Sequence, residues 1–145
     1  MALGEATRLA WKWNVTQIPS TLPENVAADH DYLSIAVKFD NGQDLTYLWS
    51  ASLEPGTGFR CPLPGWDTRE THVVLRSGRK NLGQWLLEDR NIQADYAGYV
   101  GGTLPTRITH VWLIANTIFH QGAGDARFGD INLGASGKGS WTGVL

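Results

Sequence analysis

The amino-acid sequence predicts an all-β protein, an antiparallel β-sandwich of the jelly-roll type with about seven or eight strands and one short helix. Two observations predict this fold. Short apolar runs recur along the chain with Gly- and Pro-rich connections between them, and no helical segment of about 10 to 15 residues alternates with them. The length of 145 residues suits one hydrophobic core. We therefore expect residues 1–145 to form a single β-sandwich domain.

Residues 8–15 predict the first strand. Apolar and polar side chains alternate there, which is the period of a strand with one buried face. Because large aromatic side chains are usually buried, we expect Trp11 and Trp13 on that face to pack in the core rather than to form a ligand platform. Residues 17–30 follow as a connecting loop that contains two prolines.

Residues 32–39 and 44–50 predict a β-hairpin. Both runs are rich in apolar and aromatic side chains, and Asn41-Gly42 lies between them. An Asn-Gly pair readily adopts the positive φ angles that a tight hairpin turn requires. Residues 54–67 contain three prolines and three glycines, so we expect a long exposed loop there.

The second half of the chain predicts four more extended segments and the short helix. Residues 73–78 and 82–90 are extended segments separated by a turn. Asn91 can cap a short helix. Residues 107–116 are rich in β-branched and apolar side chains and predict a central strand, and residues 125–133 predict the last strand.

Composition and charge exclude some classes of partner. The net charge is −2, with 12 basic and 14 acidic residues interspersed, so we expect no nucleic-acid or anionic-membrane partner. No apolar run reaches the about 18 residues that a membrane-spanning helix needs. Cys61 is the single cysteine, so no internal disulfide can form, which fits a bacterial protein. The compartment stays open, because removal of a signal peptide would leave a secreted or periplasmic chain.

A set of spaced motifs, rather than any single motif, indicates a family resemblance. In chain order the motifs are Trp11 and Trp13, Tyr47 and Trp49, VVLRSG at 73–78, LGQW at 82–85, Glu88, RN at 90–91, ADY at 94–96 and FGDI at 128–131. They span most of residues 9–133, and the sequence resembles a bacterial family of unknown function, DUF3047. That family is similar to galactose-binding-like jelly-roll domains, the architecture of many carbohydrate-binding modules. The resemblance therefore implies a jelly-roll fold and a carbohydrate ligand.

A carbohydrate or another small polar ligand is the expected partner. Flat aromatic rings bind the apolar faces of sugars, and planar hydrogen-bonding side chains bind their hydroxyl groups. Seven tryptophans supply such rings, and Phe119 adds one where the family has an acidic loop. The side chains expected on the ligand surface are Trp49, Trp66, Arg76, Gln84, Trp85, Asn116 and Phe119, with Glu88 beside them.

Structural roles are the alternative for several of these residues. Trp85 and Trp112 could fill the sandwich, and Trp66 could fasten its loop to the body of the protein. Arg76 and Glu88 could form a structural ion pair, which we favour because charged groups in a sheet usually pair with each other.

A structural calcium ion is a further hypothesis, and no other cofactor is expected. Calcium requires several oxygen ligands. Asp130 and Glu5 could contribute two of them if the ends of the chain lie together, although no Asp-rich loop is visible.

An enzyme is the alternative function. A small β-sandwich lyase, hydrolase or cyclase acting on a polar or cyclic substrate would use Glu88, Asp95 or His120 as acid or base. The four histidines lack metal-ligand spacing, and the sequence places no histidine beside Cys61. We therefore expect a non-catalytic carbohydrate-binding module. A protein-interaction module anchored by exposed tryptophans is the third hypothesis.

Overall fold

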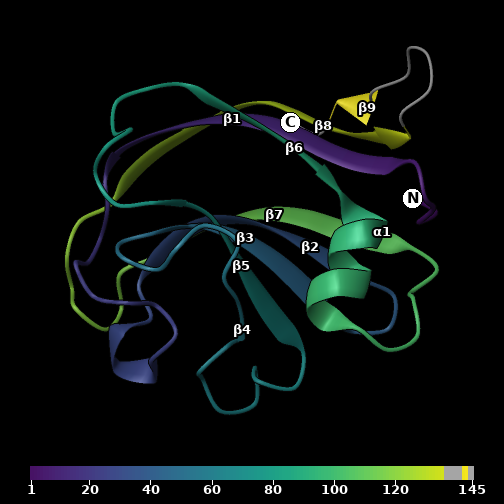
Figure 1. Ribbon diagram of the computed structural model, residues 1–145, viewed down its shortest axis with the longest axis horizontal. Coiled ribbons are helices and arrows are strands. Elements are labelled where there is room, and N and C mark those ends of the chain that lie inside the picture. Colours follow the sequence, from purple (N-terminus) through teal and green to yellow (C-terminus); the bar gives the residue numbers. More distant parts are fainter. Residues whose placement is uncertain (136–141, 144–145) are drawn as a thin grey trace.

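Two β-sheets face each other in the computed structural model, which describes residues 1–135 and 142–143 (Figure 1). In chain order the strands are β1 (Thr7–Gln17), β2 (Tyr32–Phe39), β3 (Asp44–Ser50), β4 (Gly58–Arg60), β5 (Glu70–Ser77), β6 (Leu86–Asn91), β7 (Ile108–Asn116), β8 (Asp125–Ala135) and β9 (Thr142–Gly143). The smaller sheet has the order β6-β1-β8-β9, and the larger has the order β4-β5-β3-β2-β7. The two layers confirm the expected β-sandwich.

Strand β1 supplies much of the core between the sheets. Its alternating pattern buries one face completely, and both tryptophans of that face lie inside. The Trp13 ring lies 5.8 Å from that of Trp11 and 5.5 Å from that of Trp49 in β3, measured between ring centroids. Aromatic rings at this separation are in contact, and the pair of Trp13 and Trp49 joins the two layers. The core is therefore built around a tryptophan cluster, as the alternation of β1 predicts.

The larger sheet begins with the predicted hairpin of β2 and β3. Gly42 takes the positive φ of 82° that the turn requires. The sheet is mixed rather than wholly antiparallel, because β5 pairs with β3 in the parallel sense. The long connection through β4 allows this, since parallel neighbours need a connection that returns the chain to the same end of the sheet.

Two sequence predictions about exposure were wrong. Residues 54–67 are not all an exposed loop, because β4 forms there against β5 and Cys61 is buried. Residues 107–116 do not form a central strand, because β7 pairs with β2 alone among the described strands and lies at the sheet edge. An apolar composition cannot distinguish a central strand from an edge strand whose side chains cover a neighbouring surface.

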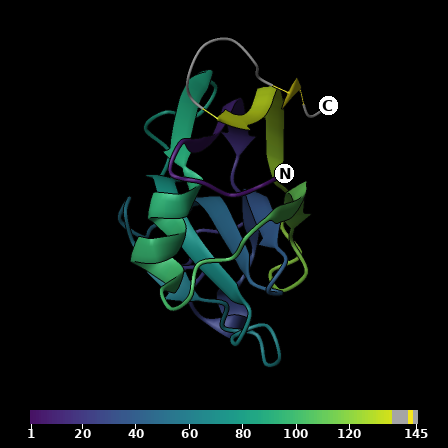
Figure 2. The ribbon, with the colours of Figure 1, turned by 90° about the vertical axis from the view of Figure 1, so that its right-hand side faces the viewer.

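The short helix is confirmed and lies at one end of the sandwich (Figures 1 and 2). It comprises α1 (Ile92–Asp95) and one wider turn, η2 (Tyr96–Val100); the other helical turn, η1 (Ala27–Asp29), lies in the loop before β2. Asn91 caps α1, since its side chain accepts a hydrogen bond from the Ala94 amide at 2.9 Å. Ile92 and Tyr96 then enter the core and close that end of it.

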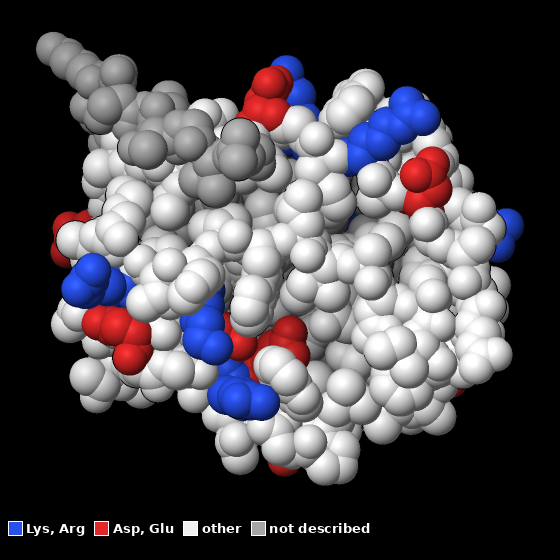
Figure 3. Space-filling view, turned by 180° about the vertical axis from the view of Figure 1, so that it is seen from behind, with Lys and Arg blue, Asp and Glu red and all other residues white. Residues whose placement is uncertain are grey.

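Strand β6 begins at Leu86, later than the extended segment predicted from residue 82. Gly83 takes a positive φ of 79°, and its amide donates to the Val15 carbonyl oxygen, so residues 79–84 form a turn. On the face in Figure 3, basic and acidic side chains lie in small mixed groups rather than in one basic area. Among the described residues, no helix is long and apolar enough to cross a membrane.

Candidate functional site

A second buried region lies on the outer face of the larger sheet. Alternate residues of β5 point away from the core, so Val73 enters the core while Glu70 and His72 face the opposite side. Loops at residues 18–31 and 51–69 cover that side. The polar side chains buried under them are Glu24, His30, Ser34, Asp44, Thr46, Ser50, Glu70 and His72. This layer contains these polar groups beside a small apolar cluster of Tyr32, Leu48 and Val74, whereas the region between the sheets is mainly apolar.

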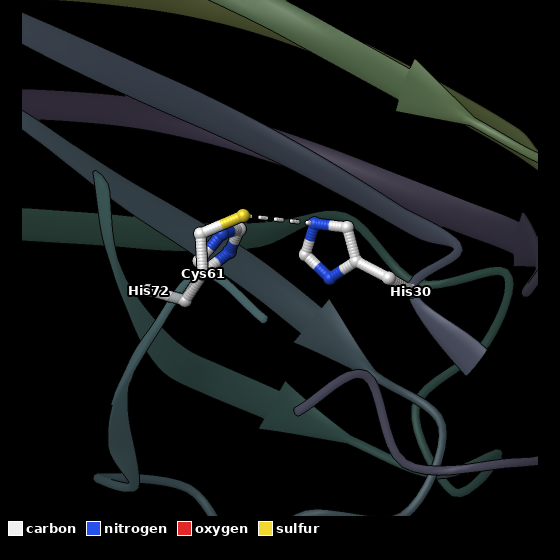
Figure 4. Close-up of side chains that lie close together, drawn as sticks. All are labelled: His30, Cys61 and His72. Atoms are coloured by element: carbon white, nitrogen blue, oxygen red, sulfur yellow. Dashed lines mark hydrogen bonds between the residues drawn. The ribbon is translucent and has the colours of Figure 1, made fainter. Parts of the chain in front are cut away.

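Three potential metal ligands meet in this layer (Figure 4). His30 lies just before β2, Cys61 lies just after β4, and His72 lies in the middle of β5. The three side chains are at most 1% exposed, and their ligand atoms lie within 4.8 Å of one another. The Cys61 sulfur points at the His30 imidazole, 3.7 Å from Nε2. The fold thus gathers two imidazoles and one thiol from distant parts of the sequence.

The orientation of His30 is fixed by a backbone contact. Its Nδ1 lies 2.8 Å from the Glu24 carbonyl oxygen. A carbonyl oxygen can only accept, so Nδ1 carries the proton and donates it. In the neutral ring Nε2 is then unprotonated, and its lone pair faces Cys61.

The imidazole of His72 is completely buried without a hydrogen-bond partner within the described part of the chain. Its ring stacks on Phe59, with the centroids 5.0 Å apart and the planes 6° apart. The rings of His30 and Tyr32 each lie 5.0 Å from it and nearly perpendicular. Aromatic packing therefore holds the ring in place, while Nδ1 has no polar partner among the described residues and Nε2 lies 3.5 Å from the Glu70 carboxylate.

Glu70 is the acidic group of this site. Its Oε1 accepts a hydrogen bond from the Thr46 hydroxyl at 2.9 Å and lies 3.5 Å from His72 Nε2. Burial acts to raise the pKa of the Glu70 carboxyl group, but hydrogen bonds and the nearby His72 outweigh it and lower the pKa below its ordinary value. Glu70 is therefore an ionised carboxylate at neutral pH.

The thiol and the His30 imidazole are both uncharged. Burial raises the pKa of the Cys61 thiol to about 12. Burial also lowers the pKa of His30 from its ordinary value. A nucleophilic cysteine reacts as an accessible thiolate, whereas Cys61 is a buried thiol.

A cavity of about 460 Å³ opens beside the cluster. His30, Tyr32 and Glu70 contribute to its wall from the buried layer. Trp66 from the loop before β5 and Trp112 from β7 line it as well, with 37% and 38% of their surfaces exposed. The Arg69 guanidinium lies 4.0 Å from the Trp66 ring centroid and supports that ring. The cavity thus combines two accessible indole rings with buried polar groups.

The structure brings some of the expected ligand residues to this cavity and not others. Trp66 and Asn116 line it. Phe119 lies close by, with its ring 6.2 Å from that of His30. Trp49 lies in the core, 1% exposed, with its indole N–H donated to the Gly78 carbonyl oxygen, so its ring cannot reach a ligand.

Gln84 and Trp85 lie elsewhere. Trp85 is 53% exposed on the outer face of the smaller sheet, where it lines a separate groove of about 500 Å³ together with Leu87 and Lys12. Gln84 precedes it and is exposed. The expected single surface is therefore divided between the two outer faces of the sandwich.

Arg76 and Glu88 form an ion pair that joins the two sheets. Arg76 Nε in β5 lies 2.6 Å from Glu88 Oε1 in β6. The same oxygen accepts the indole N–H of Trp13 at 3.0 Å. Glu88 is thus occupied by core contacts, which agrees with the structural alternative for this pair.

The remaining candidate residues are also engaged in pairs. Both carboxylate oxygens of Asp95 bind Arg90, at 2.6 and 2.8 Å, and Oδ2 accepts the Tyr47 hydroxyl as well. His120 Nε2 lies 2.9 Å from Asp29 Oδ1. The three proposed acid or base residues therefore lie apart from one another, Glu88 and Asp95 in ion pairs and His120 in a contact with Asp29.

The two residues proposed for calcium do not meet. Asp130 is paired with Lys12 at 2.7 Å. Glu5 precedes β1, at the end where Thr7 pairs with Ala135, whereas Asp130 lies several residues further along β8. The register of β1 and β8 thus separates them, and their carboxylates do not form one site.

The cluster of His30, Cys61 and His72 is absent from the residues selected by sequence. Ligand spacing within one element identifies many metal sites, but these residues lie in a loop, after an edge strand and in a strand. One weak signal is present, because Glu70 and His72 are two residues apart in a strand and must share a face.

Comparison with known proteins gives a family and no functional description. A family model described as "Protein of unknown function (DUF3047)" matches residues 1–132. Neither the curated proteins nor the solved structures contain a match to the chain.

Proposed function

We propose that this chain, which belongs to the DUF3047 family, is a binding module that receives a sugar or a similar polar ring in the cavity beside Trp66 and Trp112. The observation that carries the proposal is that two half-exposed indole rings line one cavity together with buried polar side chains. Sugars are bound by this combination, because each ring covers an apolar face and the polar groups take the hydroxyl groups.

Size and polarity support the same class of ligand. A volume of about 460 Å³ falls in the range of small-molecule sites. The Glu70 carboxylate supplies an acceptor at its wall, and Asn116 adds an amide that also donates to the His30 carbonyl oxygen and accepts from the Ile118 N–H. A monosaccharide or disaccharide unit offers hydroxyl groups to both.

Binding is proposed rather than catalysis because the acid and base candidates are already paired. Asp95 is held by Arg90 and Tyr47, and Glu88 is held by Arg76 and Trp13. None of these groups lines the cavity. A ligand bound there would meet indole rings, the aliphatic side chains of Leu63, Leu113 and Ile114, a phenol, an amide, an imidazole and one carboxylate.

The test is a broad glycan array followed by titrations monitored by tryptophan fluorescence. Trp66→Ala and Trp112→Ala should each weaken binding about 10-fold, the equivalent of roughly 1.4 kcal/mol. Trp85→Ala is the matched control, because it removes an accessible ring from the opposite sheet, outside the cavity. Absence of any ligand on the array, or a loss confined to Trp85→Ala, would contradict the proposal.

A further inference from the structure

We propose that His30, Cys61 and His72 bind a divalent transition-metal ion, with Zn²⁺ the best fit, beneath the wall of the cavity. The proposal does not depend on the sugar ligand. The donor set decides the class of ion, since thiolate and imidazole select borderline and soft cations and are poor ligands for Ca²⁺ and Mg²⁺.

The distances agree with ligands of one ion. With Zn–N about 2.0–2.1 Å and Zn–S about 2.3 Å, two ligands of a tetrahedral ion lie about 3.3–3.8 Å apart. Cys61 Sγ and His30 Nε2 are 3.7 Å apart, and His72 Nε2 is 3.5 Å from Glu70 Oε1. The widest pair among the three ligand atoms lies within 4.8 Å, so closing on an ion requires a movement of about 1 Å.

The surroundings of His30 match those of a metal ligand. A ligating histidine usually donates its other ring N–H to a carbonyl or carboxylate, which fixes the tautomer and the direction of the lone pair. His30 Nδ1 makes this contact with the Glu24 carbonyl oxygen, and Nε2 faces the cluster.

His72 provides the independent observation. Burial of unpaired polar atoms costs about 1–3 kcal/mol for each group, so an imidazole with neither nitrogen hydrogen-bonded is unfavourable inside a protein. Neither His72 nitrogen makes a hydrogen bond within the described residues, although Nε2 lies 3.5 Å from Glu70 Oε1. A bound ion would satisfy one of them, and the Glu70 carboxylate lies next to the ring.

Charge also balances. Binding would proceed as Cys–SH + Zn²⁺ → Cys–S–Zn⁺ + H⁺, with the proton released to the buffer. The Glu70 carboxylate then neutralises the remaining positive charge. Three protein ligands leave a fourth position that either Glu70 or a molecule in the cavity can take.

The experiment is a titration of the chelator-treated protein with Zn²⁺ by calorimetry, and with Co²⁺ by absorbance. We expect one ion per chain, release of a proton, and a thiolate-to-cobalt charge-transfer band in the near ultraviolet. Cys61→Ser and His72→Leu should each weaken Zn²⁺ binding about 100-fold or more, and the band should vanish in Cys61→Ser.

His110→Ala is the matched control, because His110 is an exposed histidine on β7 outside the cluster. It should leave the affinity unchanged. Circular dichroism of each variant serves as the control for folding. Cys61→Ser and His72→Leu remove ligands that come from different parts of the fold, so they test the same site independently. Failure of the wild-type protein to bind Zn²⁺ stoichiometrically, or wild-type affinity for Zn²⁺ in both Cys61→Ser and His72→Leu, would overturn the proposal, as would tighter binding of Ca²⁺ or Mg²⁺ than of Zn²⁺.

Discussion

The protein buries two regions of opposite character. Between the sheets, Trp11, Trp13 and Trp49 pack with aliphatic side chains, and the indole N–H groups of Trp13 and Trp49 are hydrogen-bonded. On the outer face of the larger sheet, buried polar atoms of His72 and Asp44 lack hydrogen-bond partners in the described structure. The inner region has its own exception, the Trp11 indole nitrogen. The difference teaches that burial alone does not identify a residue's role.

Unpaired polar groups lower stability, so their retention needs a second explanation. A core of apolar side chains lowers the free energy of the folded state directly. A buried imidazole, thiol and carboxylate do not lower the free energy of the folded state unless a partner or ligand binds to them. We therefore propose that the inner region supplies stability and that the outer one binds a ligand, and the predictions below test this division.

The largest effect is expected from the inner core. Trp13→Ala should lower the free energy of unfolding by about 3–5 kcal/mol, because it leaves a cavity and removes the hydrogen bond to Glu88. Urea unfolding curves measure this change in the free energy of unfolding. Trp85→Ala is the matched control and should change stability by less than about 0.5 kcal/mol, since that ring is exposed. Equal losses in the two variants would contradict the assignment of the core.

The ion pair that joins the sheets should have the next largest effect. Glu88→Gln should lower the free energy of unfolding by about 1.5–3 kcal/mol, because it replaces the charged acceptor of the Arg76 hydrogen bond by a neutral amide. Its neighbour Asp89 forms an exposed pair with Arg8, so Asp89→Asn should cost about 0–1 kcal/mol by the same assay. If Asp89→Asn lowered the free energy of unfolding more than Glu88→Gln does, the structural role given to Glu88 would be contradicted.

A smaller effect with the opposite sign is expected at Asp44. Burial raises the pKa of its carboxyl group, so the folded protein binds a proton more tightly than the unfolded chain does. The cost of that buried charge is present above the raised pKa and disappears as the pH falls through it. Asp44→Asn should therefore stabilise the protein at a pH above the raised pKa, and the gain should shrink toward acidic pH in urea unfolding curves.

Asp40 provides the control with reversed sign. The hydrogen bond from the Thr106 side chain lowers the pKa of the exposed Asp40 carboxyl group. Its contribution to stability is present above its ordinary pKa of 3.8 and is lost as the pH falls through the lowered value. Asp40→Asn should therefore destabilise the protein at pH 7. Parallel pH profiles for Asp40→Asn and Asp44→Asn would disprove the electrostatic explanation.

The inner region could be predicted from the sequence because its signals are local. The alternation in β1 placed Trp11 and Trp13 in the core, Asn41-Gly42 fixed the hairpin, and Asn91 indicated the helix cap. Each signal acts within a few residues, where backbone geometry follows from side-chain type.

The outer site could not be predicted because its residues meet only through tertiary structure. His30 and Cys61 reach His72 through loops that fold over the sheet, and the order of β4, β5, β3 and β2 brings those loops together. The parallel pairing of β5 with β3 and the edge position of β7, which carries Trp112 to the cavity, depend on the same long connections. No spacing rule contains that information.

The most direct test of the two roles is the free energy of unfolding of His72→Leu in metal-free buffer. Leucine has a volume close to that of histidine and carries no polar atom, so it removes the unpaired nitrogens while filling the same space. We predict a stability within about 0.5 kcal/mol of the wild-type protein, or higher. A loss of about 2 kcal/mol or more would show that His72 supports the fold, and it would contradict the assignment of the outer region to binding.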